Sequence, residues 1–260
     1  MTALHCLDPF TEGSPAVLLL HGLGANSSMW ALQFEALQSI GLRPLAPDIP
    51  GFGESKYDGH GWTFRRVAAA LAGLVSDLQV GPVHLIGLSM GGVIAQQFAL
   101  DYPALVRKLV LVSTFAVLQP ASLSQWFYFA QRAVVVHAMG LSAQSKIVAR
   151  RVFPEPGQDE LREMAEKQIA SADVRAYRAA MRSLAFFNSR DRLREIKAST
   201  LVISGANDST VAPVYQKVLA DEIPDARQII IPDAGHAVAI DQYEKFNAVV
   251  KNFLGNGKYP

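Results

Sequence analysis

A serine flanked by glycines lies about a third of the way along this 260-residue chain. Residues 87–91 have the pattern Gly-x-Ser-x-Gly, with Ser89 at the centre. The pattern follows an apolar run at 83–86 and opens a helical pattern at 91–100, which is the strand–turn–helix setting of a nucleophilic serine. Such a hydroxyl attacks carbonyl carbons once a base removes its proton. The alternative is an ordinary glycine-rich turn.

The glycines around Ser89 have a steric purpose. A nucleophilic serine sits at a tight, strained turn, and Gly87 and Gly91 leave room for that turn because they carry no Cβ. Gly92 would let the following helix pack close to the strand. The free amides at the start of that helix would point toward the serine oxygen. We therefore predict that Ser89 is a nucleophile.

The base that Ser89 needs is expected among the six histidines of the chain. His236 lies in a loop after the apolar run 227–231, at the carboxyl end of a predicted strand, where ligands bind in open α/β sheets. His84 lies inside the strand before Ser89 and is expected in the core. His21 lies in a turn and is expected to order the backbone there. We predict that His236 is the base.

A carboxylate must orient the base and stabilise its protonated form. Asp208 follows the apolar run 200–204 in a loop, again at a predicted carboxyl end. Asp233 and Asp241 flank the histidine and remain alternatives, with a turn residue and a helix cap as their expected roles. The chain order serine, aspartate, histidine is the order expected for a triad on this type of sheet.

An oxyanion formed at the attacked carbonyl needs amide donors. The N–H of Met90, next to the nucleophile, is predicted as one donor. The turn at residues 21–24 should supply the second, and we predict the N–H of Leu23, with Gly24 as its rival. Taken alone, this turn could also be a plain glycine turn.

The elements that must position these groups alternate along the chain. Apolar runs predict strands at 17–20, 44–46, 83–86, 109–112, 200–204 and 227–231. Helical periodicity predicts helices at 63–78, 91–100, 214–222 and 241–254, with Thr63 as a cap. This alternation predicts an α/β fold with a mostly parallel sheet, covered by helices on both faces.

Residues 115–190 break the alternation and predict several helices without a strand between them. We predict a helical cap at 115–190, inserted between two strands of a core formed by 1–114 and 191–260. Trp126 and Phe129 in this segment, and Trp30 after the oxyanion turn, are candidates for binding substrate, with a role in the core as the alternative for each. The segment holds ten basic and six acidic residues. A solvated helix surface is the ordinary interpretation, and a cationic lid that favours substrates bearing a carboxylate is the alternative.

Composition narrows the function classes. Half of the residues are hydrophobic and the net charge is +1, which indicates a folded protein and gives no sign of nucleic acid or an anionic membrane as a partner. Cys6 is the only cysteine, so no intrachain disulfide can form, and we expect a cytoplasmic protein without a signal peptide or membrane span. The predicted chemistry needs no metal and no cofactor. Oligomeric state is not predicted.

Five segments in sequence resemble the α/β-hydrolase superfamily, in particular its small capped serine esterase and lactonase branch. They are His21-Gly22, the loop 48–55 with Asp48, the turn 87–92, Gly205-x-x-Asp208 and Gly235-His236. The resemblance covers nearly the whole chain and implies a sheet of seven or eight strands. Seven strands are expected if the usual N-terminal strand pair is short, because only 15 residues precede Ala16. The resemblance also implies a structural loop at 48–55. A serine at position 89, where other branches have aspartate, argues against epoxide hydrolases and haloalkane dehalogenases.

Several functions remain open on this resemblance. The first is a carboxylesterase for small to medium acyl esters. Others are an enol-lactonase acting on 3-oxoadipate enol-lactone, a C–C bond hydrolase of aromatic degradation, and acyl transfer or perhydrolysis. A non-catalytic, receptor-like binding protein is the alternative from another class. The expected partner is a small-molecule ester or lactone.

Overall fold

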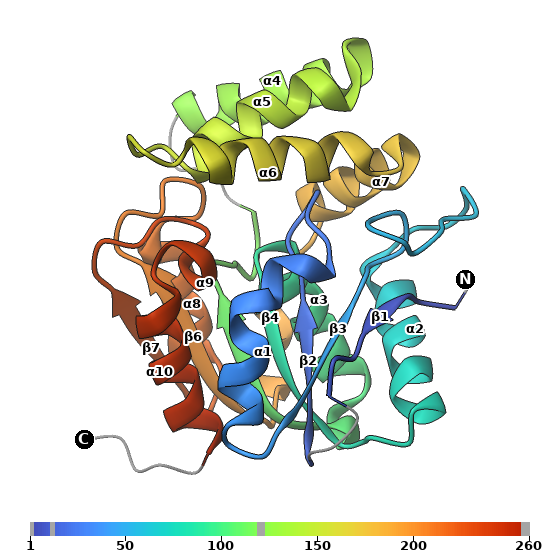
Figure 1. Cartoon of the computed structure of the whole chain (residues 1–260), viewed down its shortest axis with the longest axis vertical. Helices are drawn as coiled ribbons and strands as arrows, with labels where there is room; N and C mark the ends of the chain where they lie inside the picture. The colour runs from blue at the N-terminus through green and yellow to red at the C-terminus, as the bar shows by residue number, and fades with distance from the viewer. Residues whose placement is uncertain (1–2, 11–13, 119–122, 256–260) are drawn as a thin grey trace.

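A seven-stranded sheet forms the centre of the molecule (Figure 1). The computed structural model describes residues 3–10, 14–118 and 123–255. The strand order is β1-β3-β2-β4-β5-β6-β7, and all neighbours are parallel except β1 and β3. The strands are β1 (Cys6–Leu7), β2 (Ala16–Leu20), β3 (Arg43–Pro47), β4 (Val83–Leu88), β5 (Val106–Val112), β6 (Ser199–Gly205) and β7 (Ala226–Ile231). The predicted α/β-hydrolase sheet is confirmed, with seven strands in the described part of the chain.

The central strands are buried on both faces, which explains their unbroken apolar runs. In β2, Leu18 and Leu20 belong to the core on one face, while Val17 and Leu19 belong to the core on the other face. All four are fully buried, and each such leucine contributes about 1.5–3 kcal/mol by leaving water. Residues of opposite facing in one strand thus tie two helical layers to the same sheet.

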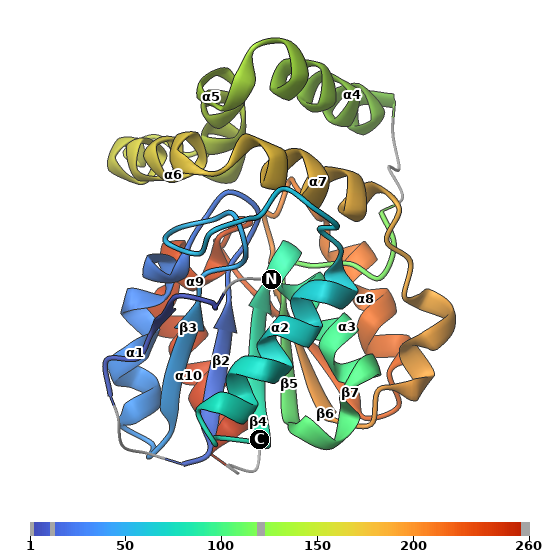
Figure 2. The same cartoon turned by 90° about the vertical axis from the view of Figure 1, so that its right-hand side faces the viewer.

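Helices cover both faces of the sheet (Figures 1 and 2). One face carries α2 (Phe64–Asp77), α3 (Met90–Asp101) and α8 (Pro213–Glu222), and the other carries α1 (Ala31–Gln38), α9 (Val238–Asp241) and α10 (Tyr243–Leu254). Thr63 caps α2 as predicted, because its side chain accepts a hydrogen bond from the N–H of Arg66 at 3.2 Å. The single helix predicted at 241–254 is wrong at its start, since α9 ends at Asp241 and α10 begins after Gln242.

Four helices between β5 and β6 form a layer over the carboxyl ends of the strands (Figures 1 and 2). They are α4 (Leu123–Ala138), α5 (Gly140–Val152), α6 (Asp159–Ser171) and α7 (Val174–Ala185), and we call them the helical layer. The chain leaves the sheet and returns to it side by side, since Val117 and Asn188 form an antiparallel bridge. The bounds 115–190 of a separate cap domain stay a prediction.

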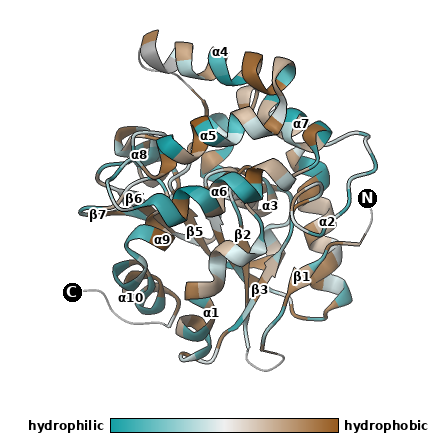
Figure 3. Ribbon diagram, turned by 45° about the horizontal axis from the view of Figure 1, so that its top comes forward, coloured by the Kyte–Doolittle hydropathy of each residue, from teal (hydrophilic) through white to brown (hydrophobic). Residues whose placement is uncertain are grey.

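The outermost helix of this layer, α4, carries hydrophobic and hydrophilic residues in alternation along its length (Figure 3). Leu123, Trp126, Phe127 and Val134 on α4 are all more than half exposed. Within the described ranges, no helix is long and apolar enough to cross a membrane.

Candidate active site

Ser89 lies at the turn between β4 and α3, in a backbone conformation that residues with a side chain rarely adopt. Its φ is 55° and its ψ is −113°. Such a conformation costs about 1–3 kcal/mol and persists only where surrounding contacts hold it. Here the N–H of Ser89 donates to Val112 O at 2.9 Å, and its carbonyl accepts from the hydroxyl of Thr114 at 2.8 Å. The turn is therefore clamped from the end of β5.

Gly87 and Gly91 lie so close to neighbouring backbone atoms that neither position has room for a side chain. A Cβ at Gly91 would lie 2.0 Å from the carbonyl oxygen of Leu20, and one at Gly87 would lie 2.3 Å from that of Gly91. A Cβ at Gly92 would lie 2.6 Å from Thr114. The predicted steric purpose of these glycines is confirmed by these close approaches.

His236 is buried beside Asp208, at the carboxyl ends of β6 and β7. Its Nδ1 lies 3.0 Å and 3.1 Å from the two carboxylate oxygens of Asp208, so Nδ1–H donates and Nε2 is left as an acceptor. The Asp208 carboxylate also accepts from the N–H groups of Thr210 and Val211, both at 2.8 Å, and from Gln216 Nε2 at 3.3 Å. These donors fix the carboxylate that orients the imidazole.

The two alternative carboxylates have other surroundings. Asp233 is an exposed turn residue with φ 61°, as expected for that role. The predicted cap role of Asp241 is wrong, because this residue lies at the end of α9 and its carboxylate accepts from the N–H of Gly235 at 2.7 Å. Burial raises the pKa of Asp241. Of the three, Asp208 is the carboxylate that hydrogen-bonds His236.

His21 and His84 are buried neutral residues away from this pair. The Nε2 of His21 accepts from the N–H of Ile49 at 2.9 Å, and its Nδ1 donates to Gly22 O at 2.8 Å, so it orders two loops as predicted. His84 lies in β4 and is buried in the core, also as predicted. Burial lowers the pKa of both to about 4, with Lys108 and Arg107 adding to the effect at His84.

The predicted structural loop after β3 is confirmed around Asp48. Its buried carboxylate accepts from the N–H groups of Ser27 at 2.7 Å and Glu54 at 2.9 Å. Burial would raise the pKa of Asp48, but these hydrogen bonds outweigh it and lower the pKa below its usual value. The carboxylate thus ties the turn before α1 to its own loop and has no direct contact with the pocket described below.

The turn after β2 lies against the serine turn, where the oxyanion donors were predicted. A Cβ on Gly22 would lie 3.7 Å from the Cβ of Ser89. The N–H groups of Leu23 and Met90 donate to no residue in the part of the chain that the structure describes. Met90 is the first residue of α3, so its N–H is also one of the free amides at a helix start. Both groups are available to a ligand.

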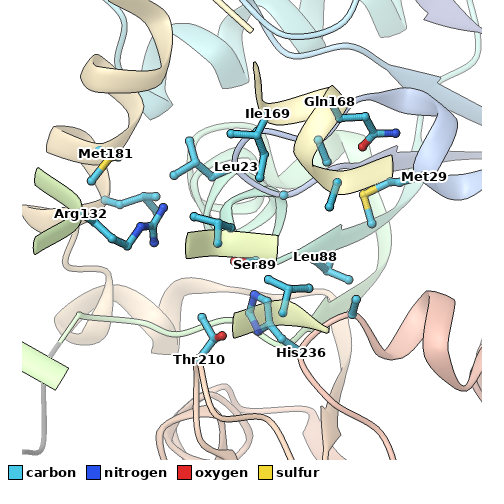
Figure 4. Close-up of a pocket in the computed structure, with 18 of the residues that line it drawn as sticks. Leu23, Met29, Leu88, Ser89, Arg132, Gln168, Ile169, Met181, Thr210 and His236 are labelled. Carbon is cyan, nitrogen blue, oxygen red and sulfur yellow. The ribbon is translucent and has the colours of Figure 1, made fainter. Parts of the chain in front are cut away.

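A pocket of about 700 Å³ separates the sheet from the helical layer (Figure 4). Ser89 and His236 border it from the sheet, as do Leu23 and Leu88. No hydrogen bond joins His236 to the Ser89 hydroxyl among the described residues, and such contacts often shorten only when substrate binds. Most of the lining is apolar, so the pocket suits an acyl chain.

The three aromatic residues that were predicted to bind substrate differ in whether they line this pocket. Phe129 lines the pocket. Trp30 does not, because it is fully buried in the core on the face of the sheet that carries α1 and α10, where it packs against Phe246. Trp126 is 60% exposed on α4 and lies outside the lining as well. The pocket therefore gives no support to the predicted substrate-binding role of either tryptophan. In the described part of the chain, no group of His, Cys, Asp and Glu is placed to hold a metal ion.

The model of the alpha/beta hydrolase fold family matches residues 15–243 of this chain. The chain belongs to the alpha/beta hydrolase fold family. A poly(3-hydroxyalkanoate) depolymerase of Ectopseudomonas oleovorans is 31% identical over 241 residues, which cover 92% of this alpha/beta hydrolase and 83% of the depolymerase. The 3-oxoadipate enol-lactonase 2 of Acinetobacter baylyi is 26% identical, with coverage of 92% and 90%. A thermophilic esterase of Thermogutta terrifontis, solved with malate bound, is 31% identical and superimposes with a TM-score of 0.84 over 96% of this chain and 92% of its own.

Three polar residues at the site of this alpha/beta hydrolase were not predicted from the sequence. Gln216 holds Asp208 and accepts from the hydroxyl of Ser204 at 2.8 Å. Thr210 lines the pocket and binds Asp208 through its N–H. Arg132 reaches the pocket from α4. Thr210 and Gln216 lie near Asp208 in sequence, but threonine and glutamine are ordinary residues of loops and helices, and the burial of Arg132 depends on packing against Tyr177. The sequence therefore held no signal that singled them out.

Proposed function

We propose that this alpha/beta hydrolase cleaves carboxylic esters of small to medium acyl chain through an acyl-enzyme on Ser89. The observation that carries the proposal is the buried His236–Asp208 pair, whose imidazole borders the same pocket as a serine in a strained turn. A free hydroxyl is a weak nucleophile, and a paired imidazole with a free Nε2 is the group that activates it.

The mechanism follows from the roles that these groups can take. Ser89 Oγ attacks the ester carbonyl while His236 Nε2 takes the hydroxyl proton, and Asp208 stabilises the imidazolium that forms. The N–H groups of Met90 and Leu23 donate to the oxyanion. His236 then gives its proton to the leaving alkoxide, and the alcohol departs. Water, deprotonated by His236, attacks the acyl-enzyme, and the bond between the acyl carbon and Ser89 Oγ breaks as His236 returns the proton to Oγ, which releases the acid and restores the Ser89 hydroxyl.

The pocket supports a substrate of limited size. Its volume of about 700 Å³ lies in the range of small-molecule sites, and Leu88, Val152 and Ile169 are among its apolar lining residues. The relatives described above carry the names of a poly(3-hydroxyalkanoate) depolymerase, an enol-lactonase and an esterase, and a poly(3-hydroxyalkanoate) is a polyester. All three names imply cleavage of an ester linkage, open or cyclic.

A second candidate is hydrolysis of an enol-lactone that carries a carboxylate. It is favoured by one observation, the arginines that line the pocket from the helical layer: Arg132, Arg178 and Arg182. An enol-lactone opens through the same acyl-enzyme, so the two candidates differ in substrate and share the reacting groups.

Hydrolysis of p-nitrophenyl acetate and butyrate by purified Ser89→Ala tests the proposal. We expect kcat to fall at least about 10³-fold, because the nucleophile is lost. Ser76→Ala, at an exposed position of α2, should retain wild-type turnover. A fluorophosphonate probe should add its mass to the peptide that contains Ser89.

Two results would contradict this function. One is a Ser89→Ala protein that keeps more than about a tenth of wild-type kcat, since an acyl-enzyme on Ser89 predicts a much larger loss. The other is a wild-type protein that turns over neither ester while binding ligands of the same shape, which would favour the receptor-like class.

A further inference from the structure

We propose that Arg132 binds a carboxylate on the substrate, so that this enzyme prefers esters or lactones that carry a carboxylate in their acyl part. This inference rests on the proposed ester hydrolysis at Ser89. It names a substrate class for that site and a residue that selects it.

Arg132 lies on α4 and lines the pocket from the helical layer, whereas Ser89 and His236 border the same pocket from the sheet. Figure 4 shows its guanidinium pointing from the helical layer into this pocket. The residue is only 9% exposed. A buried side chain of this kind is held in place by its surroundings and does not move freely in solvent.

The contacts of the Arg132 guanidinium are to neutral groups. Nη2 donates to the hydroxyl of Tyr177 at 3.0 Å, and Cζ lies 5.5 Å from the ring centroid of Tyr128. Among the described residues, no carboxylate lies within ion-pair distance of Arg132, and its buried Nε has no hydrogen-bond partner. The positive charge is therefore buried without a counter-charge there.

An unpaired buried cation is costly. Removing such a charge from water is unfavourable even after relaxation of the protein. A tyrosine hydroxyl and the face of an aromatic ring offset only part of that cost. A carboxylate would supply the missing charge and accept from the unused donors, which is the strongest pairing open to a guanidinium. The site is thus prepared for an anion that the substrate brings.

The other charges of the helical layer do not meet this need. None of the described residues that line the pocket is Asp or Glu. The acidic residues Asp159 and Asp173 pair with Arg162 and Arg175 on the surface. Their ion pairs are partly exposed and screened by solvent.

The two other pocket arginines have different surroundings. Arg178 donates to the carbonyl of Val136 at 2.8 Å and thereby holds the end of α4. Arg182 is exposed. Arg132 is therefore the buried pocket cation without an acidic partner in the described chain. One guanidinium matches the single negative charge of a carboxylate better than the charge of about −2 on a phosphate monoester.

A matched pair of substrates tests the proposal. The mono-p-nitrophenyl ester of glutaric acid carries a terminal carboxylate, and p-nitrophenyl valerate has the same acyl length without it. We expect the wild type to have at least about tenfold higher kcat/KM for the acidic ester. In Arg132→Gln, kcat/KM for the acidic ester should fall about 10- to 100-fold, the size of a charged hydrogen bond, while the neutral ester changes less than about threefold. Arg132→Lys should recover part of the preference.

Two controls separate this inference from its alternatives. Arg150→Gln removes the same charge from an exposed position on α5 and should leave the preference intact, which excludes long-range steering. Binding of free glutarate, measured by calorimetry, should weaken about 10- to 100-fold in Arg132→Gln.

Each outcome supports or overturns the role of Arg132. Equal kcat/KM for both esters in the wild type would overturn the proposal, as would an equal loss for both in Arg132→Gln, which would mark a packing role. If neither ester is turned over, the proposed ester hydrolysis fails, and glutarate binding still decides whether Arg132 holds a carboxylate.

Discussion

Asparagine in place of Asp208 isolates the role of its charge, because the side chain keeps its shape. In Asp208→Asn one oxygen still accepts from the N–H groups of Thr210 and Val211, so the loop after β6 should stay in place. The new amide N–H₂ replaces the oxygen that faces His236 Nδ1 at 3.0 Å and Gln216 Nε2 at 3.3 Å. It cannot accept from either.

The consequence falls on the tautomer of His236. The oxygen that remains lies 3.1 Å from Nδ1, but the new N–H₂ group opposes a proton on Nδ1 and favours the tautomer with the ring proton on Nε2, and a protonated Nε2 cannot take the proton of Ser89. We expect kcat for p-nitrophenyl butyrate to fall about 10³- to 10⁴-fold, which corresponds to about 4–5.5 kcal/mol of transition-state stabilisation. The unsatisfied donor of Gln216 should lower the free energy of unfolding by about 1–3 kcal/mol.

The two rival carboxylates provide matched controls. Asp233→Asn changes an exposed residue whose φ of 61° asparagine tolerates, so kcat and stability should stay near wild type. Asp241→Asn keeps an oxygen for the N–H of Gly235 and should lower kcat less than Asp208→Asn. Steady-state kinetics and urea unfolding of the three variants check these values. An Asp208→Asn protein with more than about a tenth of wild-type kcat would refute the assignment of this carboxylate.

One further prediction concerns the contact of α3 with β2, and another concerns a buried histidine of β4. Gly91→Ala would place a Cβ 2.0 Å from Leu20 O and should lower the free energy of unfolding by about 3 kcal/mol or more. Gly73→Ala on exposed α2, with open space at its Cβ, should raise the free energy of unfolding by about 0.5–1 kcal/mol, and thermal unfolding of both variants compares them directly. Because the pKa of His84 is lowered to about 4, unfolding takes up a proton between about pH 6.5 and 4, so stability falls as pH falls through this range. His84→Leu should make that fall shallower by up to about 1.4 kcal/mol per pH unit in urea titrations, and an unchanged slope would speak against a neutral buried His84.

Local patterns carried the prediction of the serine turn. The strand, the two glycines and the helix around Ser89 are consecutive in sequence, so the sterics that shape the turn can be derived without knowing the rest of the fold. His236 and Asp208 were placed by a weaker argument, their position after predicted strands. That argument could not separate Asp208 from Asp233, because both follow a strand end, and the hydrogen bond to His236 depends on how β6 and β7 lie side by side.

Long-range packing decided what the sequence left open. Trp30 follows the turn after β2, but nearness in sequence does not reveal that its ring packs on Phe246 in the core. Arg132 was one of ten basic residues in its segment, and its burial depends on Tyr177, 45 residues further along the chain. Gln216 is likewise an ordinary helix residue until its contact with Asp208 is known. Such contacts have no local signature.

The bridge between Val117 and Asn188 brings together the points where the chain leaves the sheet and returns to it. Everything that the helical layer contributes to the pocket thus comes from one continuous segment of the chain, while Ser89, Asp208 and His236 lie outside that segment. A library confined to that stretch would vary the substrate without touching the reacting groups. The same separation applies to evolution, since changes in one internal segment alter the substrate specificity of a duplicated copy while the sheet and the reacting groups stay unchanged.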